Sequence, residues 1–153
     1  MQPITIRKAT LNDLPTLLQF EQDLIDAERP FDPTLQGSPT AYYNLPEMIT
    51  AAHIELVVAE HNAVVIGCGY ARIENAMPYL KHRQYAYLGF MYTLPAYRGK
   101  GINNLVMDDL KKWSAAQGIT ELRLEVYYQN LPAIKAYEKV GFTPLKLEMR
   151  LGI

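Results

Sequence analysis

Apolar residues recur along this chain with two different periods, and each period predicts one kind of element. A spacing of two, or a short continuous apolar run, predicts strands, and a spacing of three and four predicts helices. The predicted strands cover residues 3–8, 54–60, 63–74, 84–93, 120–126 and 142–151. The predicted helices cover about 14–29, 45–52, 101–116 and 131–140.

The order of these elements predicts the fold class. Neighbouring strands without an intervening helix form hairpins, whereas the strand–helix–strand units of the second half place strands in parallel. We therefore expect an α/β (α+β) fold, with a mixed, mostly antiparallel central sheet of about six to seven strands and about four helices around it. No repeat or linker divides the chain, so residues 1–153 are expected to form a single domain.

The strand predicted at residues 84–93 carries a local irregularity. Its aromatic side chains Tyr85 and Tyr87 lie on one parity, and Phe90 and Tyr92 lie on the other. A glycine inside a strand, here Gly89, together with a change of parity indicates a β-bulge, and bulges often occur beside active sites. A strand that is simply bent at this point would give the same pattern.

A glycine-rich turn, RGKGINN at residues 98–104, stands between this strand and the next predicted helix. Amide groups at a helix start are unpaired, and together with the helix dipole they form a site for phosphate or pyrophosphate. Gly99 and Gly101 would let the backbone approach such a ligand, and Arg98 and Lys100 add positive charge. A surface turn with solvated cations is the alternative. The sequence matches neither a P-loop nor a dinucleotide fingerprint, whose third glycine is replaced here by Asn104.

Composition excludes several classes of function. A net charge of −1 and a pI near 6.3 argue against nucleic acid or an acidic membrane as the main partner. The single cysteine, Cys68, fits a reducing compartment, and no signal peptide or membrane span is expected, so we predict a cytoplasmic protein. The three histidines, at 53, 61 and 82, lack partners at ligand spacing, so no metal site is expected.

Two segments of the chain resemble signatures of the GNAT family of N-acetyltransferases. The segment TLPAYRGKGI, residues 93–102, resembles that family's acetyl-CoA loop, [QR]-x-x-G-x-[GA]. The segment NLPAIKAYEKVGF, residues 130–142, is similar to its second signature, N-x-x-A-x-x-x-Y-E-x-x-G-F. The order of elements also matches along nearly the whole chain. One position departs, because Asn103 stands where the family usually has glycine or alanine.

The resemblance implies acetyl-CoA as the cosubstrate and a set of binding residues. The CoA pyrophosphate would lie on the loop, and the pantetheine arm would lie along the end of the fourth strand. The fourth and fifth strands would be splayed at the bulge to admit the thioester. The implied cofactor-binding residues are Met91, Tyr92, Thr93, Arg98, Gly99, Lys100, Gly101, Ile102, Asn103, Asn104 and Asn130.

The same resemblance implies two catalytic residues. Tyr137 would act on the departing thiolate, although its spacing alone is also that of a core aromatic residue. Glu125 lies twelve residues earlier, as the catalytic glutamate does in the ribosomal-protein N-terminal acetyltransferases that this segment resembles. Glu125 could equally lie on a solvated strand face beside Arg123. An amide N–H of Met91 or Tyr92, freed at the bulge, is the candidate for stabilising the oxyanion.

The expected activity is transfer of the acetyl group of acetyl-CoA to a primary amine of a small molecule, peptide or protein. The alternative is a non-catalytic acyl-CoA-binding or regulatory domain of the same fold. Six acidic residues and only one basic residue lie between Gln19 and Met48, in the region that walls the acceptor side of this fold. That balance favours a cationic amine, unless it is only a solvated helix face. The sequence leaves a homodimer open.

Overall fold

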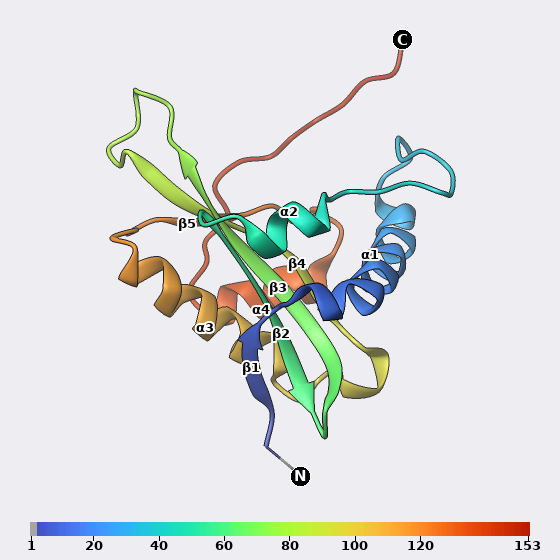
Figure 1. Ribbon diagram of the computed structural model, residues 1–153. Helices are drawn as coiled ribbons and strands as arrows, with labels where there is room; N and C mark the ends of the chain where they lie inside the picture. Colours follow the sequence, from blue (N-terminus) through green and yellow to red (C-terminus); the bar gives the residue numbers. More distant parts are fainter. Residues whose placement is uncertain (1–2) are drawn as a thin grey trace.

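The computed structural model describes residues 3–153, in which five strands form one sheet with helices on both faces (Figure 1). The strands are β1 (Thr5–Lys8), β2 (Ile54–His61), β3 (Val64–Asn75), β4 (Gln84–Thr93) and β5 (Leu122–Leu124). They lie in the sheet in their order along the chain. The first four pair antiparallel, and β5 is parallel to β4. This is the mixed, mostly antiparallel sheet that the sequence predicts.

Four α-helices connect or flank these strands: α1 (Leu14–Glu28), α2 (Leu45–Thr50), α3 (Ile102–Ala116) and α4 (Leu131–Lys139). Short 3-10 segments occur at Leu11–Asp13, Arg29–Phe31 and Pro95–Tyr97. Two of the helices begin at an asparagine, because the side-chain oxygen of Asn44 accepts the amide of Glu47 and that of Asn130 accepts the amide of Ala133. A proline follows in the first turn of each, where its missing N–H costs no hydrogen bond.

The two faces of the sheet carry separate apolar clusters. One cluster packs α1 and α2 on the sheet, with Leu17, Phe20 and Leu56 among its buried members. The other packs α3 on the opposite face, with Val106 and Leu110 buried and side chains of α4 at its margin. A helix layer on each face leaves the ends of the strands open, and the glycine-rich turn follows one such end, that of β4 (Figure 1).

The prediction of six to seven strands is wrong at the carboxyl-terminal part of the chain. Residues 142–151 form no strand, and β5 is shorter than the predicted 120–126. A strand exists only where backbone groups pair with a neighbour, and no backbone hydrogen bond joins residues 143–153 to the remainder of the described chain. The segment extends away from the sheet after Gly141, as Figure 1 shows. Among residues 3–153 no helix is long and apolar enough to cross a membrane.

Candidate active site

Strands β4 and β5 separate at a bulge in β4. In the pairing of β3 with β4, the single residue Gly69 faces two residues of β4, Phe90 and Met91. Phe90 adopts a left-handed backbone with a φ of 52°. On its other side β4 pairs with β5 only as far as Leu88, although β4 continues to Thr93. The splayed fourth and fifth strands that the resemblance implied are therefore present.

Position 89 requires glycine because there is no room for a side chain there, and not because the backbone has a conformation that favours glycine. A Cβ on Gly89 would lie 2.7 Å from the hydroxyl of Tyr70 and 2.8 Å from two of its ring carbons. The ring of Tyr70 thus occupies the position that any larger residue at 89 would need. The bulge predicted at Gly89 is confirmed, but the extra residue and the positive φ fall one position later, at Phe90. The buried thiol of Cys68 donates to the carbonyl of Phe90 at 3.3 Å, which satisfies one group of the irregular backbone.

The glycine-rich turn places a row of free amides at the start of α3. Gly99 and Gly101 have φ values of 75° and 80°, a region that favours glycine, and Gly101 directly precedes the helix. Among the described residues, none of the backbone amides from 99 to 104 makes a hydrogen bond. No side chain caps this helix start either. Free amides at a helix amino terminus are the geometry that binds phosphate groups.

The cations of the turn are held against aromatic rings. The Nε of Arg98 donates to the carbonyl oxygen of Thr93 at 3.0 Å, and its guanidinium carbon lies 5.7 Å from the ring centre of Tyr92. The ammonium of Lys100 lies 5.5 Å from the ring centre of Tyr97. Arg98 therefore ties the turn to the end of β4, so that the two segments expected to hold CoA adjoin one another.

Four further residues that the sequence predicts for cofactor binding lie in the first turn of α3 or at the start of α4. The side chain of Ile102 is buried in the core, so only its backbone amide is available to a ligand. Asn103 and Asn104 stand in the first turn of α3, half-buried and exposed respectively. Asn130 uses its side-chain oxygen as the cap of α4, which leaves its amide nitrogen as the group free for a ligand.

Glu125 lies at the point where the two strands part. It follows the last residue of β5, and extension of the register from Leu88 and Leu124 places it opposite Gly89. The carboxylate is exposed. Burial is the main cause of the raised pKa of Tyr87, and the nearby charge of Glu125 raises it further. Arg123, the cation that could have made Glu125 an ordinary surface group, instead pairs with Glu121 at 3.1 Å.

Tyr137 lies on α4. Its half-buried ring packs against Phe142 with ring centres 6.0 Å apart. Burial raises the pKa of Tyr137, and the charge of Glu28 adds to the effect, so the phenol stays protonated at neutral pH. Among the described residues, no hydrogen bond joins Tyr137 to Glu125. The structure places these two predicted catalytic residues on separate segments, Glu125 directly after β5 and Tyr137 on α4.

Glu28 is a candidate functional residue that the sequence did not single out. It is the last residue of α1, it is half-buried, and burial raises the pKa of its carboxyl. Burial is the main cause of the raised pKa values of Tyr42 and Tyr127, and the charge of Glu28 raises both further. In the sequence Glu28 is one of six similar carboxylates, and no local pattern separates it from the other five. Only the packing of α1 over the open strand ends does so.

Most of the other acidic residues in this region have partners inside the protein. Glu21 is buried, and its carboxylate accepts the backbone amides of Tyr42 and Tyr43 at 2.9 and 2.8 Å. Asp26 pairs with Arg29 at 3.3 Å. Such carboxylates stabilise the loop after α1, so the simple count of acidic residues overstates the charge that an acceptor would meet.

The loop after α1 also bridges to the chain beyond β5. The hydroxyl of Tyr127 donates to Asp32 at 2.8 Å, and its ring stacks on Phe31 with centres 5.9 Å apart. Among residues 3–153 no group of three histidine, cysteine or acidic side chains is arranged to hold a metal ion.

Comparison with known sequences identifies the family. The model of the acetyltransferase (GNAT) family matches residues 20–142. An N-alpha-acetyltransferase of Sulfolobus acidocaldarius is 26% identical over 147 residues, which cover 93% of this chain and 81% of that protein. A streptothricin acetyltransferase of Escherichia coli is 38% identical over 47 residues. That match covers 31% of this chain and only 27% of the relative's length.

Solved structures share the fold. A mutant protein from Bacillus halodurans has a TM-score of 0.87 at 18% identity, covering 97% of this chain and 99% of its own. A predicted acetyltransferase from Clostridium acetobutylicum, solved with acetyl-CoA, has a TM-score of 0.73 at 19% identity, with 98% and 96% covered. An aminoglycoside N-acetyltransferase in complex with CoA has a TM-score of 0.75 at 18% identity, with 97% and 98% covered.

These findings agree with the geometry of the site. The family match spans α1 to the end of α4, and it includes the bulged strand, the glycine-rich turn and the helix that bears Tyr137. The structural matches extend the agreement in fold to nearly the whole chain. The chain belongs to the acetyltransferase (GNAT) family.

Proposed function

We propose that this protein is an N-acetyltransferase that transfers the acetyl group of acetyl-CoA to a primary amine. One observation carries the proposal: the free amides at the start of α3 adjoin the opening between β4 and β5. The turn suits a pyrophosphate, and the opening exposes strand backbone on which an extended thioester arm can lie. A non-catalytic CoA-binding domain would need the free amides at the start of α3, but it would not need ionisable groups at the opening between β4 and β5.

The cosubstrate would lie along the residues named from the sequence. The pyrophosphate would accept hydrogen bonds from amides of residues 99–104, with the side chains of Arg98 and Lys100 beside it. The pantetheine arm would pair with backbone of residues 91–93, and the amide nitrogen of Asn130 would approach from the other side. In support, residues 98–101 are exposed and the amides of 99–104 are free in the described chain.

The reaction itself asks little covalent chemistry of the protein. The amine nitrogen attacks the thioester carbon, the oxyanion that forms collapses, and the carbon–sulfur bond breaks to release the CoA thiolate. We assign the oxyanion to an amide of Met91 or Tyr92 beside the bulge. Tyr137 would donate to the thiolate, since its raised pKa keeps its proton available.

The amine must lose a proton, and two carboxylates are candidates to accept it. An ordinary glutamate facing an ammonium ion is roughly 8 kcal/mol short of deprotonating it, so the base needs a raised pKa or a water relay. Glu125 stands at the vertex of the splay and is exposed, which suits a relay through water. Glu28 is half-buried with a raised pKa, which suits direct proton transfer or selection of a neutral amine.

The acceptor is proposed to be cationic. Glu28 and Asp32 lie on the side of α1 and its following loop that faces Tyr127 and Tyr137, and this charge favours a second positive group on the amine. Polyamines, aminoglycosides and free lysine fit that description, and so does a peptide amino terminus that lies beside a basic residue. The relative named as an N-alpha-acetyltransferase supports a peptide amino terminus as the acceptor. The solved structure named as an aminoglycoside N-acetyltransferase supports an aminoglycoside.

Two measurements test the function together. Acetyl-CoA should raise the melting temperature, because only the folded turn binds it, whereas NADH should not. Release of free CoA thiol should then depend on the amine, with amines that carry a second positive charge favoured over singly charged amines such as benzylamine. Stabilisation by acetyl-CoA without thiol release on any amine would contradict catalysis and leave the binding domain. Absence of stabilisation would contradict the cosubstrate as well.

A further inference from the structure

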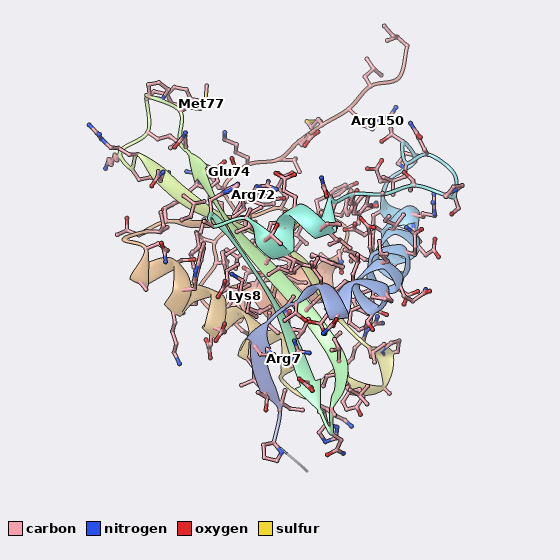
Figure 2. All side chains as sticks on the ribbon, viewed as in Figure 1. Arg7, Lys8, Arg72, Glu74, Met77 and Arg150 are labelled. Atoms are coloured by element: carbon pink, nitrogen blue, oxygen red, sulfur yellow. The ribbon has the colours of Figure 1, made fainter. Side chains whose placement is uncertain are left out.

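A carboxylate of α1 holds the last buried side chain of β4. The hydroxyl of Tyr92 donates to Oδ2 of Asp23 at 3.2 Å. The other oxygen, Oδ1, accepts the side-chain amide of Gln19, one turn earlier in the helix, at 2.9 Å. The contact lies between α1 and the sheet, a space that side chains fill (Figure 2). Because both oxygens of Asp23 have donors inside the protein, the carboxylate is fixed relative to the end of β4.

Tyr92 connects this carboxylate to the glycine-rich turn. Its ring is buried, with its centre 4.8 Å from that of Phe20. The guanidinium carbon of Arg98 lies 5.7 Å from the centre of the same ring. Burial is the main cause of the raised pKa of Tyr92, the charge of Asp23 raises it further, and the charge of Arg98 lowers it. Two opposite charges therefore act on one phenol, Asp23 at its hydroxyl and Arg98 at its ring.

We propose that Asp23 is a positioning residue for cosubstrate binding, which acts by holding Arg98 against Tyr92 beside the start of α3. A phenol that donates its proton to a carboxylate has a more electron-rich ring, and such a ring attracts a cation more strongly. Among residues 3–153 no carboxylate forms an ion pair with Arg98, so this exposed cation is held by the ring of Tyr92 and the carbonyl of Thr93. This role of Asp23 rests on the proposed function, because it takes acetyl-CoA as the ligand of the turn.

The backbone at the end of β4 is held in place without Asp23. The amide of Leu94 donates to the carbonyl of Ile66 at 2.8 Å, directly after the last pair of the β3–β4 register. A Cβ on Gly67 would lie 2.9 Å from the carbonyl oxygen of Tyr92, so the two strands are in close contact here. Loss of the Asp23 carboxylate should therefore leave the strand end in place and free the side chains that depend on it.

The sign of the change in binding separates positioning from long-range charge. Acetyl-CoA carries negatively charged phosphates, so removal of a nearby carboxylate would strengthen its binding if Coulomb interaction alone decided the outcome. Positioning predicts the opposite sign, because an Arg98 side chain released from Tyr92 must be ordered again when the ligand binds. Asp23→Ala should raise the Kd of acetyl-CoA by roughly fivefold.

Calorimetric titration with acetyl-CoA tests this role in a matched set of variants. Asp23→Asn keeps an oxygen for the hydroxyl of Tyr92, so its Kd should stay within about twofold of the parent value. Tyr92→Phe keeps the buried ring but loses the same hydrogen bond, so it should raise the Kd as Asp23→Ala does. Asp26→Ala is the control, because it removes an equal charge from the same helix, where the carboxylate pairs with Arg29, and it should not raise the Kd.

A double-variant cycle shows whether Asp23 acts through Arg98. In an Arg98→Ala background, Asp23→Ala should have no further effect on the Kd, whereas a general loss of structure would weaken binding in both backgrounds. Three results would overturn the role of Asp23 while the parent still binds acetyl-CoA. They are a Kd that does not rise in Asp23→Ala and Tyr92→Phe, an equal rise in Asp26→Ala, or an undiminished effect in the Arg98→Ala background. A parent chain that does not bind acetyl-CoA would instead overturn the proposed cosubstrate itself.

Discussion

Replacement of Gly89 by alanine should destabilise the protein by about 1–3 kcal/mol, because it overpacks the bulge of β4. The new Cβ would lie 2.7–2.8 Å from three atoms of the Tyr70 side chain, and real Cβ contacts do not come so close. The ring of Tyr70 is 3% exposed, so it cannot swing into solvent to make room.

Neighbouring rings limit how far Tyr70 can shift. Its ring centre lies 5.8 Å from that of Tyr43 in an edge-on contact and 6.3 Å from that of Tyr87. Any movement therefore disturbs the residues that wall the opening between β4 and β5. For a chain of this length a loss of 1–3 kcal/mol lowers the melting temperature by roughly 3–10 °C.

Urea denaturation of a small set of variants checks this reasoning. Gly37→Ala is the control, because a Cβ at Gly37 meets nothing within 4 Å, and its cost should stay within about 0.5 kcal/mol. In a Tyr70→Leu background the cost of Gly89→Ala should fall by at least about 1 kcal/mol, since the clashing ring is gone. In a Tyr70→Phe background it should persist, because the two ring carbons at 2.8 Å remain.

Two results would refute the argument. A Gly89→Ala protein as stable as the parent would show that the bulge has room for a side chain. An equal cost in the parent and Tyr70→Leu backgrounds would show that the tyrosine ring is not the cause.

Four further predictions address the site. Tyr137→Phe should lower kcat more than it raises KM for acetyl-CoA, and an unchanged kcat in steady-state assays would return Tyr137 to a packing role. Glu125→Gln should shift the pH–rate profile to higher pH, where the amine is already neutral, and an unshifted profile would remove Glu125 as the base. Gly101→Val should nearly abolish acetyl-CoA binding by calorimetry, because its φ of 80° strains a β-branched residue, whereas Asn103→Gly should change the Kd by less than about tenfold. Burial raises the pKa of the Glu28 carboxyl above its ordinary 4.5, so the folded state binds the carboxyl proton more tightly than the unfolded state does. The free energy of unfolding therefore falls as the pH rises from the ordinary pKa through the raised one. Glu28→Gln should therefore be more stable than the parent in neutral urea denaturation and lose that advantage below about pH 4; equal stability at both pH values would contradict the assignment.

Local sequence determined most of the elements and the glycine-rich turn. Apolar periodicity, prolines and capping residues act over a few positions, so four helices and the first four strands could be predicted without knowing their neighbours. The turn at residues 98–104 was equally accessible, because left-handed glycines and unpaired amides at a helix start are properties of the chain itself. The bulge was visible too, as a change of aromatic parity beside Gly89.

Tertiary structure decided what depends on contacts between distant segments. The sequence placed the irregularity at Gly89, but the ring of Tyr70 from β3 makes glycine necessary there and moves the positive φ to Phe90. The sequence does not distinguish the six acidic residues from one another. In the structure Glu21 is buried and accepts hydrogen bonds from two backbone amides, whereas the charge of Glu28 acts on Tyr137. A local pattern records a residue's own neighbours in sequence, and a carboxylate's role depends on neighbours in space.

The carboxyl-terminal segment shows the same division most clearly. Alternation of leucines with charged residues predicts a strand at residues 142–151, but the structure has no strand there. Whether such residues form a strand depends on a partner edge, because a strand's hydrogen bonds all lie outside itself, whereas a helix satisfies its own. In this chain the segment finds no such edge, and the sheet ends at β5. Sequence thus determines the capacity for a strand, and only the arrangement of chains in space determines the strand.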